Sequence, residues 1–386
     1  MDIDSRLRRA RAARGPWRGG NRFELLDEGE RFFGRMLESI AAARQYVLLE
    51  MYLVRSGVVS ARFVAVLAQA ARAGRRVCVV LDAFGSLGLS QEERRQLTDS
   101  GVELRLFNPL RWQNRLRNLL RDHRKLLLVD GQIAFIGGAG LTDQFALDRG
   151  NGSPWRDLMV EMTGPIVGDW QRAFARTWRE CGGEIGSLEA PLPSQPVQGA
   201  RGRMVLSEAQ PRSALACAVL QRIAHARKRA WIMSAYFVPS GRLRKALRRA
   251  ARRGVDVRLL VPGPKTDHPW VRHAARRFYG KLLRSGVKIF EYQPRMLHGK
   301  MIVCDGWVSI GSANLDRWSF RWNLEANQEI ADETFASTAA GVFAADCEVS
   351  EPLSRLHWPQ RALLDRLRER IAGTAHVWLD GLRRPR

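Results

Sequence analysis

The stretch HRKLLLVDGQIAFIGGAG occupies residues 123–140, and the related stretch HGKMIVCDGWVSIGSAN occupies residues 298–314. Each begins with His-x-Lys, continues as an apolar run of strand-like composition, and reaches Asp-Gly before a second apolar run. Asp-Gly favours the tight turn that joins two antiparallel strands, so each stretch is predicted to form a β-hairpin. The two histidines lie 175 residues apart, which indicates an internal repeat.

The sequence around each hairpin follows one plan, which supports the repeat. In the first half, an apolar run at 46–54 precedes a helical pattern at 60–73 and an apolar strand at 77–81. Alternating strands and helices are typical of parallel sheets covered by helices. We therefore predict an α/β fold of two similar domains, each a mainly parallel β-sheet flanked by helices. The corresponding segments of the second half are 231–238, 241–253 and 255–261.

Composition suggests where the domains begin and end. Residues 182–202 are rich in Gly, Pro and Ser and lack periodicity, which is typical of a linker. If a pseudo-twofold axis relates the domains, equivalent strand ends meet, so the active site is expected at the interface. The predicted segments are a basic amino-terminal segment (1–20), a first domain (21–181), the linker (182–202) and a second domain with a basic carboxy-terminal segment (203–386).

The charge of the chain limits its partners. The 63 Lys and Arg exceed the 39 Asp and Glu, giving a formal net charge of +24, and such an excess attracts nucleic acid or an anionic membrane. No apolar run approaches the roughly 20 residues of a spanning helix, so any membrane association is predicted to be peripheral. Five scattered cysteines without a C-x-x-C pair disfavour a disulfide framework and a zinc site, and indicate a reducing, cytoplasmic setting.

The paired histidines and lysines point to phosphodiester chemistry. Residues two apart on a strand face the same way, so His123 projects with Lys125, and His298 with Lys300. A neutral imidazole can attack phosphorus while an ammonium neutralises the phosphate oxygens. A second imidazole can protonate the leaving alkoxide and then act as a base. By the same parity, the aspartates that close the motifs point to the other face or into the turn, which favours a structural role.

Other polar residues are candidates to support this chemistry. Each hairpin leads to a turn of small residues that permits close approach of a phosphate, and in the second copy Ser and Asn can donate hydrogen bonds to it. Asp157 and Glu325 follow their histidines by 34 and 27 residues and are candidates to hold each imidazole in the correct tautomer. The remaining histidines show no pattern that suggests a metal site. The predicted phosphate-binding or supporting residues are Gly138, Ser312, Asn314, Asp157 and Glu325.

These motifs resemble the phospholipase D superfamily, whose signature is a duplicated H-x-K-x4-D followed by a G-[GS]-x-N turn. Within it, the chain is similar to bacterial cardiolipin synthases of the short type without amino-terminal transmembrane helices. Supporting stretches are LLDEGE (25–30), AYFVP (235–239), RGVDV (253–257) and EYQP (291–294). The first copy departs from the family at Gly140, where Asn is usual. The residues that match the family's catalytic set are His123, Lys125, Asp130, His298, Lys300 and Asp305.

The resemblance implies a cardiolipin synthase that acts without a metal or other cofactor. Such an enzyme transfers a phosphatidyl group between two phosphatidylglycerol molecules through a phosphohistidine and releases glycerol. The symmetry of the two motifs does not decide which histidine is the nucleophile; in the family the first copy often takes that role, which favours His123. Anionic phospholipid is the expected partner, at the cytoplasmic face of the bacterial cell membrane, and nucleic acid is not expected.

The sequence leaves two alternatives open. The same chemistry with water as acceptor would give a phospholipase or a nuclease, and a non-catalytic protein on this fold could bind anionic lipid or nucleic acid. Intact His and Lys in both copies count against the second alternative. Candidate membrane-docking segments combine apolar side chains with Arg, and Trp is present in two of the three. They are residues 110–121, 242–253 and 361–386. For the segment without Trp, 242–253, a helix that covers the sheet is the favoured alternative.

Overall fold

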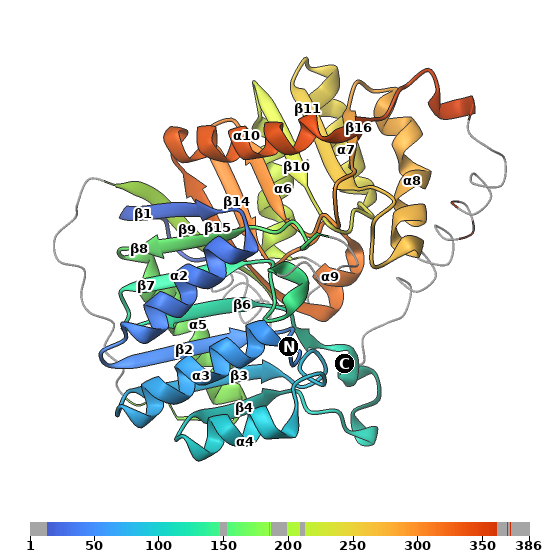
Figure 1. Ribbon diagram of the computed structural model, residues 1–386. Helices are drawn as coiled ribbons and strands as arrows, with labels where there is room; N and C mark the ends of the chain where they lie inside the picture. Colours follow the sequence, from blue (N-terminus) through green and yellow to red (C-terminus); the bar gives the residue numbers. More distant parts are fainter. Residues whose placement is uncertain are drawn as a thin grey trace, which may run out of the picture.

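The computed structural model describes residues 14–146, 153–184, 186, 199–208, 213–360, 369 and 371. One large twisted sheet runs through the molecule, and helices pack against both of its faces (Figure 1). This confirms the predicted α/β class. Most of the basic amino-terminal segment, most of the predicted linker and nearly all of the carboxy-terminal docking candidate lie outside the described residues.

The two halves contain matching elements in the same order. The first half comprises β1 (Arg18–Leu26), α2 (Gly29–Ala41), β2 (Tyr46–Met51), α3 (Val58–Arg72), β3 (Arg76–Asp82), α4 (Gln91–Asp99), β4 (Glu103–Phe107), η1 (Trp112–Leu119), β5 (Arg121–Asp122), β6 (Lys125–Val129), β7 (Ile133–Gly137), η2 (Asp143–Phe145), β8 (Met159–Thr163) and α5 (Ile166–Glu180). The second comprises β9 (Ala200–Glu208), α6 (Ala214–His225), β10 (Arg229–Met233), α7 (Gly241–Arg252), β11 (Asp256–Pro262), α8 (Pro269–Leu283), β12 (Lys288–Tyr292), β13 (Met301–Cys304), β14 (Trp307–Gly311), α9 (Arg317–Trp322), β15 (Asn323–Ala331), α10 (Glu333–Glu348), β16 (Ser350–Pro352) and η3 (Trp358–Gln360).

Strand order shows the duplication directly. From the centre outward, the first half runs β1-β8-β7-β6-β2-β3-β4 and the second runs β9-β15-β14-β13-β10-β11-β12, with β16 added at the edge. The antiparallel pair β1 and β9 joins the halves into one continuous sheet. The predicted repeat of two similar units is therefore confirmed.

The prediction that each sheet is mainly parallel is wrong for the central strands. Within each half, only the outer strands, β2-β3-β4 and β10-β11-β12, are connected through helices and pair in parallel. The hairpins β6-β7 and β13-β14 and their neighbours pair antiparallel. The physical reason is that Asp-Gly turns reverse the chain without the crossover that parallel pairing requires.

Alternating side chains of the strands fill separate cores on the two faces of the sheet. In the first half, Leu48 and Leu126 pack in one core, while Leu49 and Leu127 pack in the core formed with α2 and α3. The first of these cores also contains residues of α5, α10 and strands of the second half. Trp170 of α5 is fully buried there. The two halves therefore share apolar packing as well as strand pairing.

Several helices begin at a capping side chain, which accounts for their limits. Ser90, Ser240 and Asp332 each accept a hydrogen bond from a backbone N–H in the first turn of α4, α7 and α10. Within the ranges covered by the structure, no helix combines the length and apolar character needed to cross a bilayer.

Topology places both histidines at one end of the sheet. His123 directly precedes β6, which runs antiparallel to β2, and His298 lies shortly before β13, which starts at Met301 and runs antiparallel to β10. Both therefore lie beside the carboxyl ends of β2 and β10 and of their parallel neighbours. We call this edge, with the loops that follow β2, β3, β4, β10 and β11, the histidine end.

Candidate active site

Each catalytic-motif segment is hydrogen-bonded to the opposite half. β5 pairs with β15, and the His123 N–H donates to the Leu324 carbonyl at 2.9 Å. Reciprocally, the Arg156 carbonyl accepts from the His298 N–H at 2.7 Å. The backbone thus brings the two motifs, 175 residues apart in sequence, to the interface between the halves.

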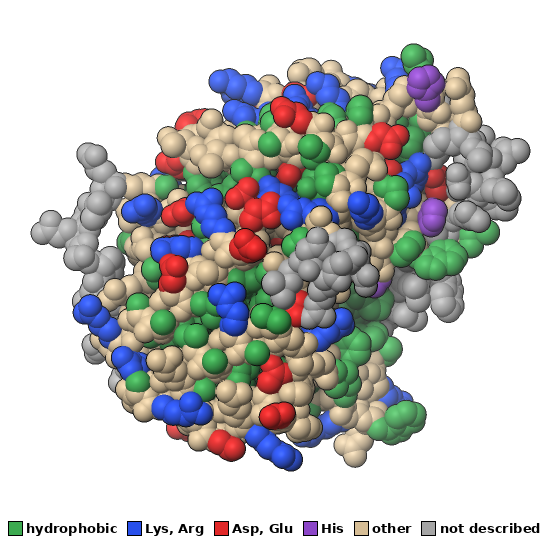
Figure 2. Space-filling model, viewed as in Figure 1, with side chains coloured by type: hydrophobic (Ala, Val, Ile, Leu, Met, Phe, Trp, Pro, Cys, Tyr) green, Lys and Arg blue, Asp and Glu red, His purple; other side chains and the backbone are tan. Residues whose placement is uncertain are grey.

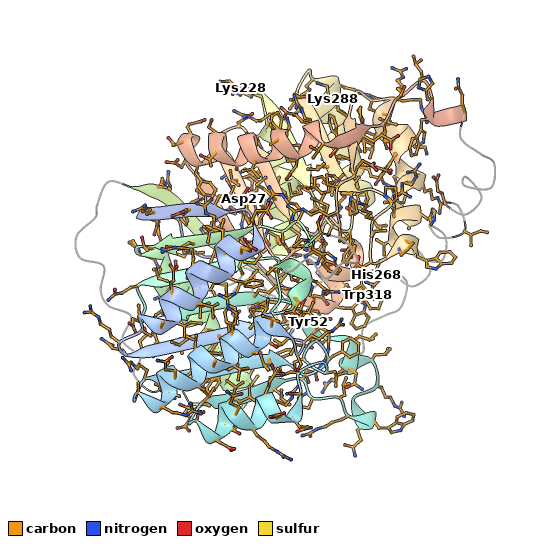
Figure 3. All side chains as sticks on the ribbon, viewed as in Figure 1. Asp27, Tyr52, Lys228, His268, Lys288 and Trp318 are labelled. Carbon is orange, nitrogen blue, oxygen red and sulfur yellow. The ribbon has the colours of Figure 1, made fainter. Side chains whose placement is uncertain are left out.

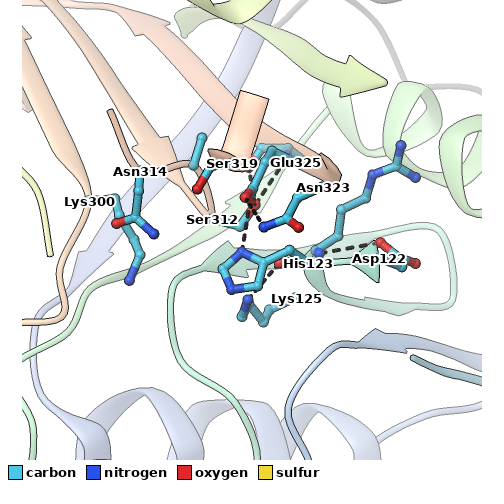
Figure 4. A network of polar contacts seen from close by, with 12 residues as sticks. Asp122, His123, Lys125, Lys300, Ser312, Asn314, Ser319, Asn323 and Glu325 are labelled. Carbon is cyan, nitrogen blue, oxygen red and sulfur yellow. Dashed lines mark hydrogen bonds and ion pairs between the residues drawn. The ribbon is translucent and has the colours of Figure 1, made fainter. Parts of the chain in front are cut away.

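The side chains of the histidines are paired crosswise with two carboxylates. His123 Nδ1 lies 3.0 Å from Glu325 Oε2, and His298 Nδ1 lies 2.5 Å from Asp157 Oδ2 (the first pair is in Figure 4). Both carboxylates are buried. Sequence reasoning selected these two acids, and the structure shows that each serves the histidine of the other half. Each carboxylate therefore holds the Nδ1 side of an imidazole that belongs to the other half.

The two lysines lie against the histidines of their own motifs. Lys125 Nζ donates to the His123 carbonyl at 2.6 Å. Lys300 Nζ donates to the His298 carbonyl and lies 2.8 and 3.1 Å from the two ring nitrogens. Burial lowers the pKa of Lys125 to about 7 and of Lys300 to about 8. Both ammonium groups are therefore poorly hydrated and suited to receive a phosphate anion.

Mutual electrostatic effects identify one site. Burial lowers the pKa of His298 to about 4, helped by the Lys300 ammonium and opposed by Asp157. Burial also lowers the pKa of His123, and the charge of Lys300 acts in the same direction. Lys125 acts on His298 in turn. Although burial alone would raise the pKa of Asp157, Lys300 and His298 outweigh it and lower that pKa, so Asp157 stays ionised.

The small-residue turns support the carboxylates. Ser312 Oγ donates to Glu325 Oε2 at 2.5 Å and accepts from the Ala326 N–H at 3.0 Å. A Cβ atom at Gly138, the corresponding position of the first copy, would collide with the Asp157 carboxylate. In this geometry the Ser312 hydroxyl holds Glu325, and the backbone at Gly138 makes room for Asp157.

The last positions of the two turns differ more strongly. Asn314 is buried, and its Oδ1 accepts from the Tyr236 N–H at 3.3 Å. A Cβ atom at Gly140 would collide with the Leu53 carbonyl. The first copy has no room for the usual Asn because its turn packs directly against the chain that follows β2, as the Leu141 N–H donates to the Leu53 carbonyl at 2.8 Å.

The two motif aspartates lie in the hairpin turns. Asp130 accepts three hydrogen bonds, all at 2.8 Å, from the backbone N–H groups of residues 44–46. Asp305 accepts three at 2.9–3.0 Å from those of residues 227–229. Both have positive φ, at 52° and 51°. These carboxylates attach the hairpins to the starts of β2 and β10. The family motif includes both aspartates in the catalytic set, but their contacts indicate a structural role.

Replacing Asp305 by Ala should therefore lower stability and leave the chemistry largely intact. Three backbone donors lose their acceptor, a loss worth about 1–3 kcal/mol in unfolding free energy, which corresponds to a fall of several degrees in Tm. Thermal unfolding and kcat/KM should be measured for the same preparation. A loss of kcat/KM beyond about tenfold in folded protein would show that Asp305 acts in the reaction.

Aromatic rings around the imidazoles were not predicted. The Tyr52 ring centroid lies 4.6 Å from that of His123, and the rings of Phe145 and Trp155 lie 5.3 and 5.5 Å from that of His298. Tyr236 lies 6.3 Å from His298. The sequence did contain a signal for the two tyrosines, because each half has a Tyr near the end of its first apolar run. These rings supply the low-dielectric surroundings that lower the histidine pKa values.

A buried arginine fixes the position of the His298 motif. Arg156 Nε donates to Asp346 at 3.0 Å, and its other nitrogens reach Glu28 at 3.1 Å and Asp27 at 3.4 Å (Asp27 is labelled in Figure 3). Its carbonyl receives the His298 N–H. Arg156 therefore links α10, the β1-α2 turn and the backbone at His298. No sequence pattern indicated this role, although Asp27 and Glu28 belong to the LLDEGE stretch.

Buried charge behind the first motif has no counterpart at the equivalent positions behind the second. Arg124 donates to Glu50 at 3.2 Å, and burial together with Glu50 raises the pKa of Asp122. The strand register makes Met233 the equivalent of Glu50, and Gly299 replaces Arg124. The two histidines are related by the repeat, but the residues that pack behind them differ: charged Glu50 and Arg124 behind His123, and Met233 and Gly299 behind His298.

Among the described residues, no three His, Cys, Asp or Glu side chains converge in a way that would hold a metal ion. The ionisable side chains that meet in the site are the two imidazoles, the two ammonium groups and the two carboxylates.

Comparison with known proteins is consistent across sequence and structure. The family described as "Cardiolipin synthase, PLD-like domain" matches residues 36–178 and 219–347. Cardiolipin synthase A of Pseudomonas aeruginosa strain LESB58 is 36% identical over 339 residues, which cover 87% of this chain and 69% of the relative. That of Pseudomonas entomophila strain L48 is 34% identical over 360 residues, which cover 92% and 75%. The crystal structure of phosphatidylserine synthase from Haemophilus influenzae Rd KW20 is 13% identical, with a TM-score of 0.73 and 98% of both chains covered, and supports the fold alone.

Proposed function

Because this chain belongs to the cardiolipin synthase family with the PLD-like domain, we propose that it transfers a phosphatidyl group from one phosphatidylglycerol to another. The observation that carries the proposal is the pair of imidazoles, each held by a carboxylate of the other half, beside two poorly hydrated ammonium groups. A phosphodiester needs a nucleophile, an acid and neutralisation of its charge, and these groups supply all three.

In the first step, Nε2 of His123 attacks phosphorus and the bond from phosphorus to the glycerol headgroup breaks. The anionic phosphodiester, once bound, raises the pKa of His298 above its value of about 4 in the free protein. The protonated ring then donates its proton to the departing alkoxide, so glycerol leaves and a phosphatidylhistidine remains. Lys125 and Lys300 neutralise the non-bridging oxygens as charge builds up. Glu325 stabilises the charge that forms on His123, because it holds Nδ1–H.

In the second step, neutral His298 takes the proton from the free hydroxyl of a second phosphatidylglycerol. The resulting oxygen nucleophile attacks phosphorus, the bond between phosphorus and His123 breaks, and cardiolipin leaves. His298 ends protonated, ready for the next donor. Asp157 accepts from Nδ1–H of His298, which fixes the tautomer of the neutral ring and stabilises the protonated ring.

The test is incubation of the purified protein with phosphatidylglycerol vesicles, followed by separation of the lipids. Cardiolipin and glycerol in equal amounts are expected. Phosphatidic acid without cardiolipin would make the protein a hydrolase, and cleavage of DNA without any lipid product would make it a nuclease.

We also propose peripheral association with anionic phospholipid at the cytoplasmic face of the bacterial membrane. The excess of 63 basic over 39 acidic residues supports attraction to anionic headgroups. Five free cysteines suit a reducing compartment.

Activity should fall at alkaline pH because the lysines lose their protons. The pKa of Lys125 is lowered to about 7 and that of Lys300 to about 8 in the free protein, so kcat/KM should decline above pH about 7–8. A bound phosphodiester favours the ammonium form, so kcat should decline at higher pH. Lys125→Arg should move the alkaline limb of kcat/KM upward, since Arg stays charged. Lys265→Arg, on an exposed loop, is the control and should leave the pH profile unchanged. If Lys125→Arg left the alkaline limb of kcat/KM where it is in the parent, the loss of activity at alkaline pH could not be assigned to Lys125.

A further inference from the structure

Exposed apolar side chains gather at the histidine end. Of the large apolar side chains that are exposed within the described ranges, seven lie in the segments that follow β2, β3, β4 and β11. Exposed large apolar side chains are normally scattered singly over a surface, so a set of them gathered at one end of the sheet indicates an interaction surface. We call the set the apolar rim. Its members are Val58, Phe84, Leu87, Leu110, Trp112, Leu116 and Trp270.

The rim of the first half is attached to the groups around His123. A Cβ atom at Gly85, next to Phe84, would collide with the Tyr52 carbonyl, so this loop passes against Tyr52. The Asn108 amide donates to the carbonyls of Arg117 and Leu120 at 2.8 Å each and closes the loop that carries Trp112. That loop leads directly into β5 and His123.

The second half contributes Trp270, 67% exposed at the start of α8. Its neighbour His268 has its ring 5.4 Å from Tyr236, and the Tyr236 hydroxyl donates to Asp267 at 2.6 Å. Tyr236 in turn faces His298. The rim therefore has parts on both halves. On the first half the Phe84 loop passes against Tyr52, whose ring contacts His123, and on the second half Trp270 lies two residues from His268, whose ring contacts Tyr236.

Charge accompanies the apolar side chains. Residues 108–121 contain no Asp or Glu, and Arg111, Arg115 and Arg117 are exposed among them. Trp112 is 95% exposed. Figure 2 shows hydrophobic side chains protruding on the lower right of the view, where Figure 1 has the segment after β4. Trp, Leu and Arg together are typical of surfaces that lie at the headgroup level of a membrane.

We propose that the apolar rim docks into the headgroup region of an anionic bilayer and presents the site to lipid phosphates. This inference rests on the proposed function, because both substrates are then bilayer lipids. A soluble protein seated on the rim would cover the histidine end, whereas a bilayer that buries it also delivers donor and acceptor. Removal of water from this end also favours the lipid hydroxyl over water as acceptor.

The experiment compares Trp112→Ser combined with Leu87→Ser against Leu356→Ser. Leu356 is 78% exposed but follows β16, at the opposite end of the sheet. Sedimentation with vesicles of phosphatidylglycerol and phosphatidylcholine measures docking without catalysis. The double variant should bind at least tenfold more weakly, and Leu356→Ser within twofold of the parent. Turnover of a short-chain phosphatidylglycerol below its micelle concentration should stay within about threefold in all three proteins.

The outcomes separate the two proposals. Equal vesicle binding by the double variant and the parent overturns the docking surface, whatever products are found. Reduced vesicle binding by a protein that makes no cardiolipin supports the surface and rejects the synthase activity. Size-exclusion chromatography tests a second copy of the chain as the occupant. If the parent is a dimer, the double variant is a monomer and vesicle binding is unchanged, the rim is a dimer interface and not a membrane-docking surface.

Discussion

The variant His123→Asn is expected to make cardiolipin at least about 10³-fold more slowly than the parent protein, because it lacks the proposed nucleophile. His298→Asn should be impaired to a similar degree with phosphatidylglycerol, since no group then protonates the leaving glycerol. The two variants should behave differently with phosphatidyl-p-nitrophenol as the donor, because its leaving group needs no proton. His298→Asn should release a burst of about one nitrophenolate per protein, and His123→Asn should release none.

The double variant provides the control for this assignment. Groups that act together in one reaction are strongly non-additive, so His123→Asn with His298→Asn should be no slower than either single variant by more than about tenfold. If the loss of activity in the double variant equalled the product of the two single losses, the two histidines would act in separate sites. A burst from His123→Asn and none from His298→Asn would reverse the two roles, and full activity of either variant would end the shared-site mechanism.

Glu325→Gln is expected to lower kcat by about 10²- to 10⁴-fold, as happens when an amide replaces the carboxylate behind a catalytic imidazole. Because Glu325 holds His123 across the interface, this variant should lose the nitrophenolate burst. Asp157→Asn, which affects His298, should lose turnover of phosphatidylglycerol and keep the burst. The measurements are steady-state kcat and burst amplitude for both variants.

Ser312→Ala is the matched control for this pair. It removes one hydrogen bond to Glu325 and keeps the carboxylate, so a loss of about tenfold or less is expected. If Asp157→Asn abolished the burst and Glu325→Gln preserved it, each acid would act within its own half, contrary to the crossed geometry.

Much of the fold could be predicted because it is local in sequence. The hairpins at Asp130 and Asp305 follow from Asp-Gly, and the repeat follows from comparing the halves. The parity argument that set the two aspartates apart from the lysines agrees with their contacts in the turns. The prediction of a mainly parallel sheet is wrong for the central strands. Strands and helices alternate only in the outer part of each half, whereas the Asp-Gly hairpins make the central strands antiparallel.

The crossed pairing could not be predicted from spacing. Asp157 follows His123 and Glu325 follows His298 in sequence, yet each contacts the other histidine because β5 adds to β15 and Arg156 bridges to Leu297. Such long-range pairing depends on how the two halves meet. Arg156 escaped notice for the same reason, since its partners Glu28 and Asp346 lie 128 and 190 residues away in the chain.

The crossed carboxylates bear on how the two copies can change over evolutionary time. After an ordinary duplication one copy is free to decay while the other keeps the activity. Here Asp157 of the first copy contacts the histidine of the second, and Glu325 of the second contacts the histidine of the first. If the proposed mechanism holds, a substitution that removes either acid impairs the histidine of the opposite copy. On that mechanism neither copy can lose its acid or its imidazole without loss of the shared activity, whereas the turns around the acids are free to diverge, as the difference between Gly140 and Asn314 illustrates.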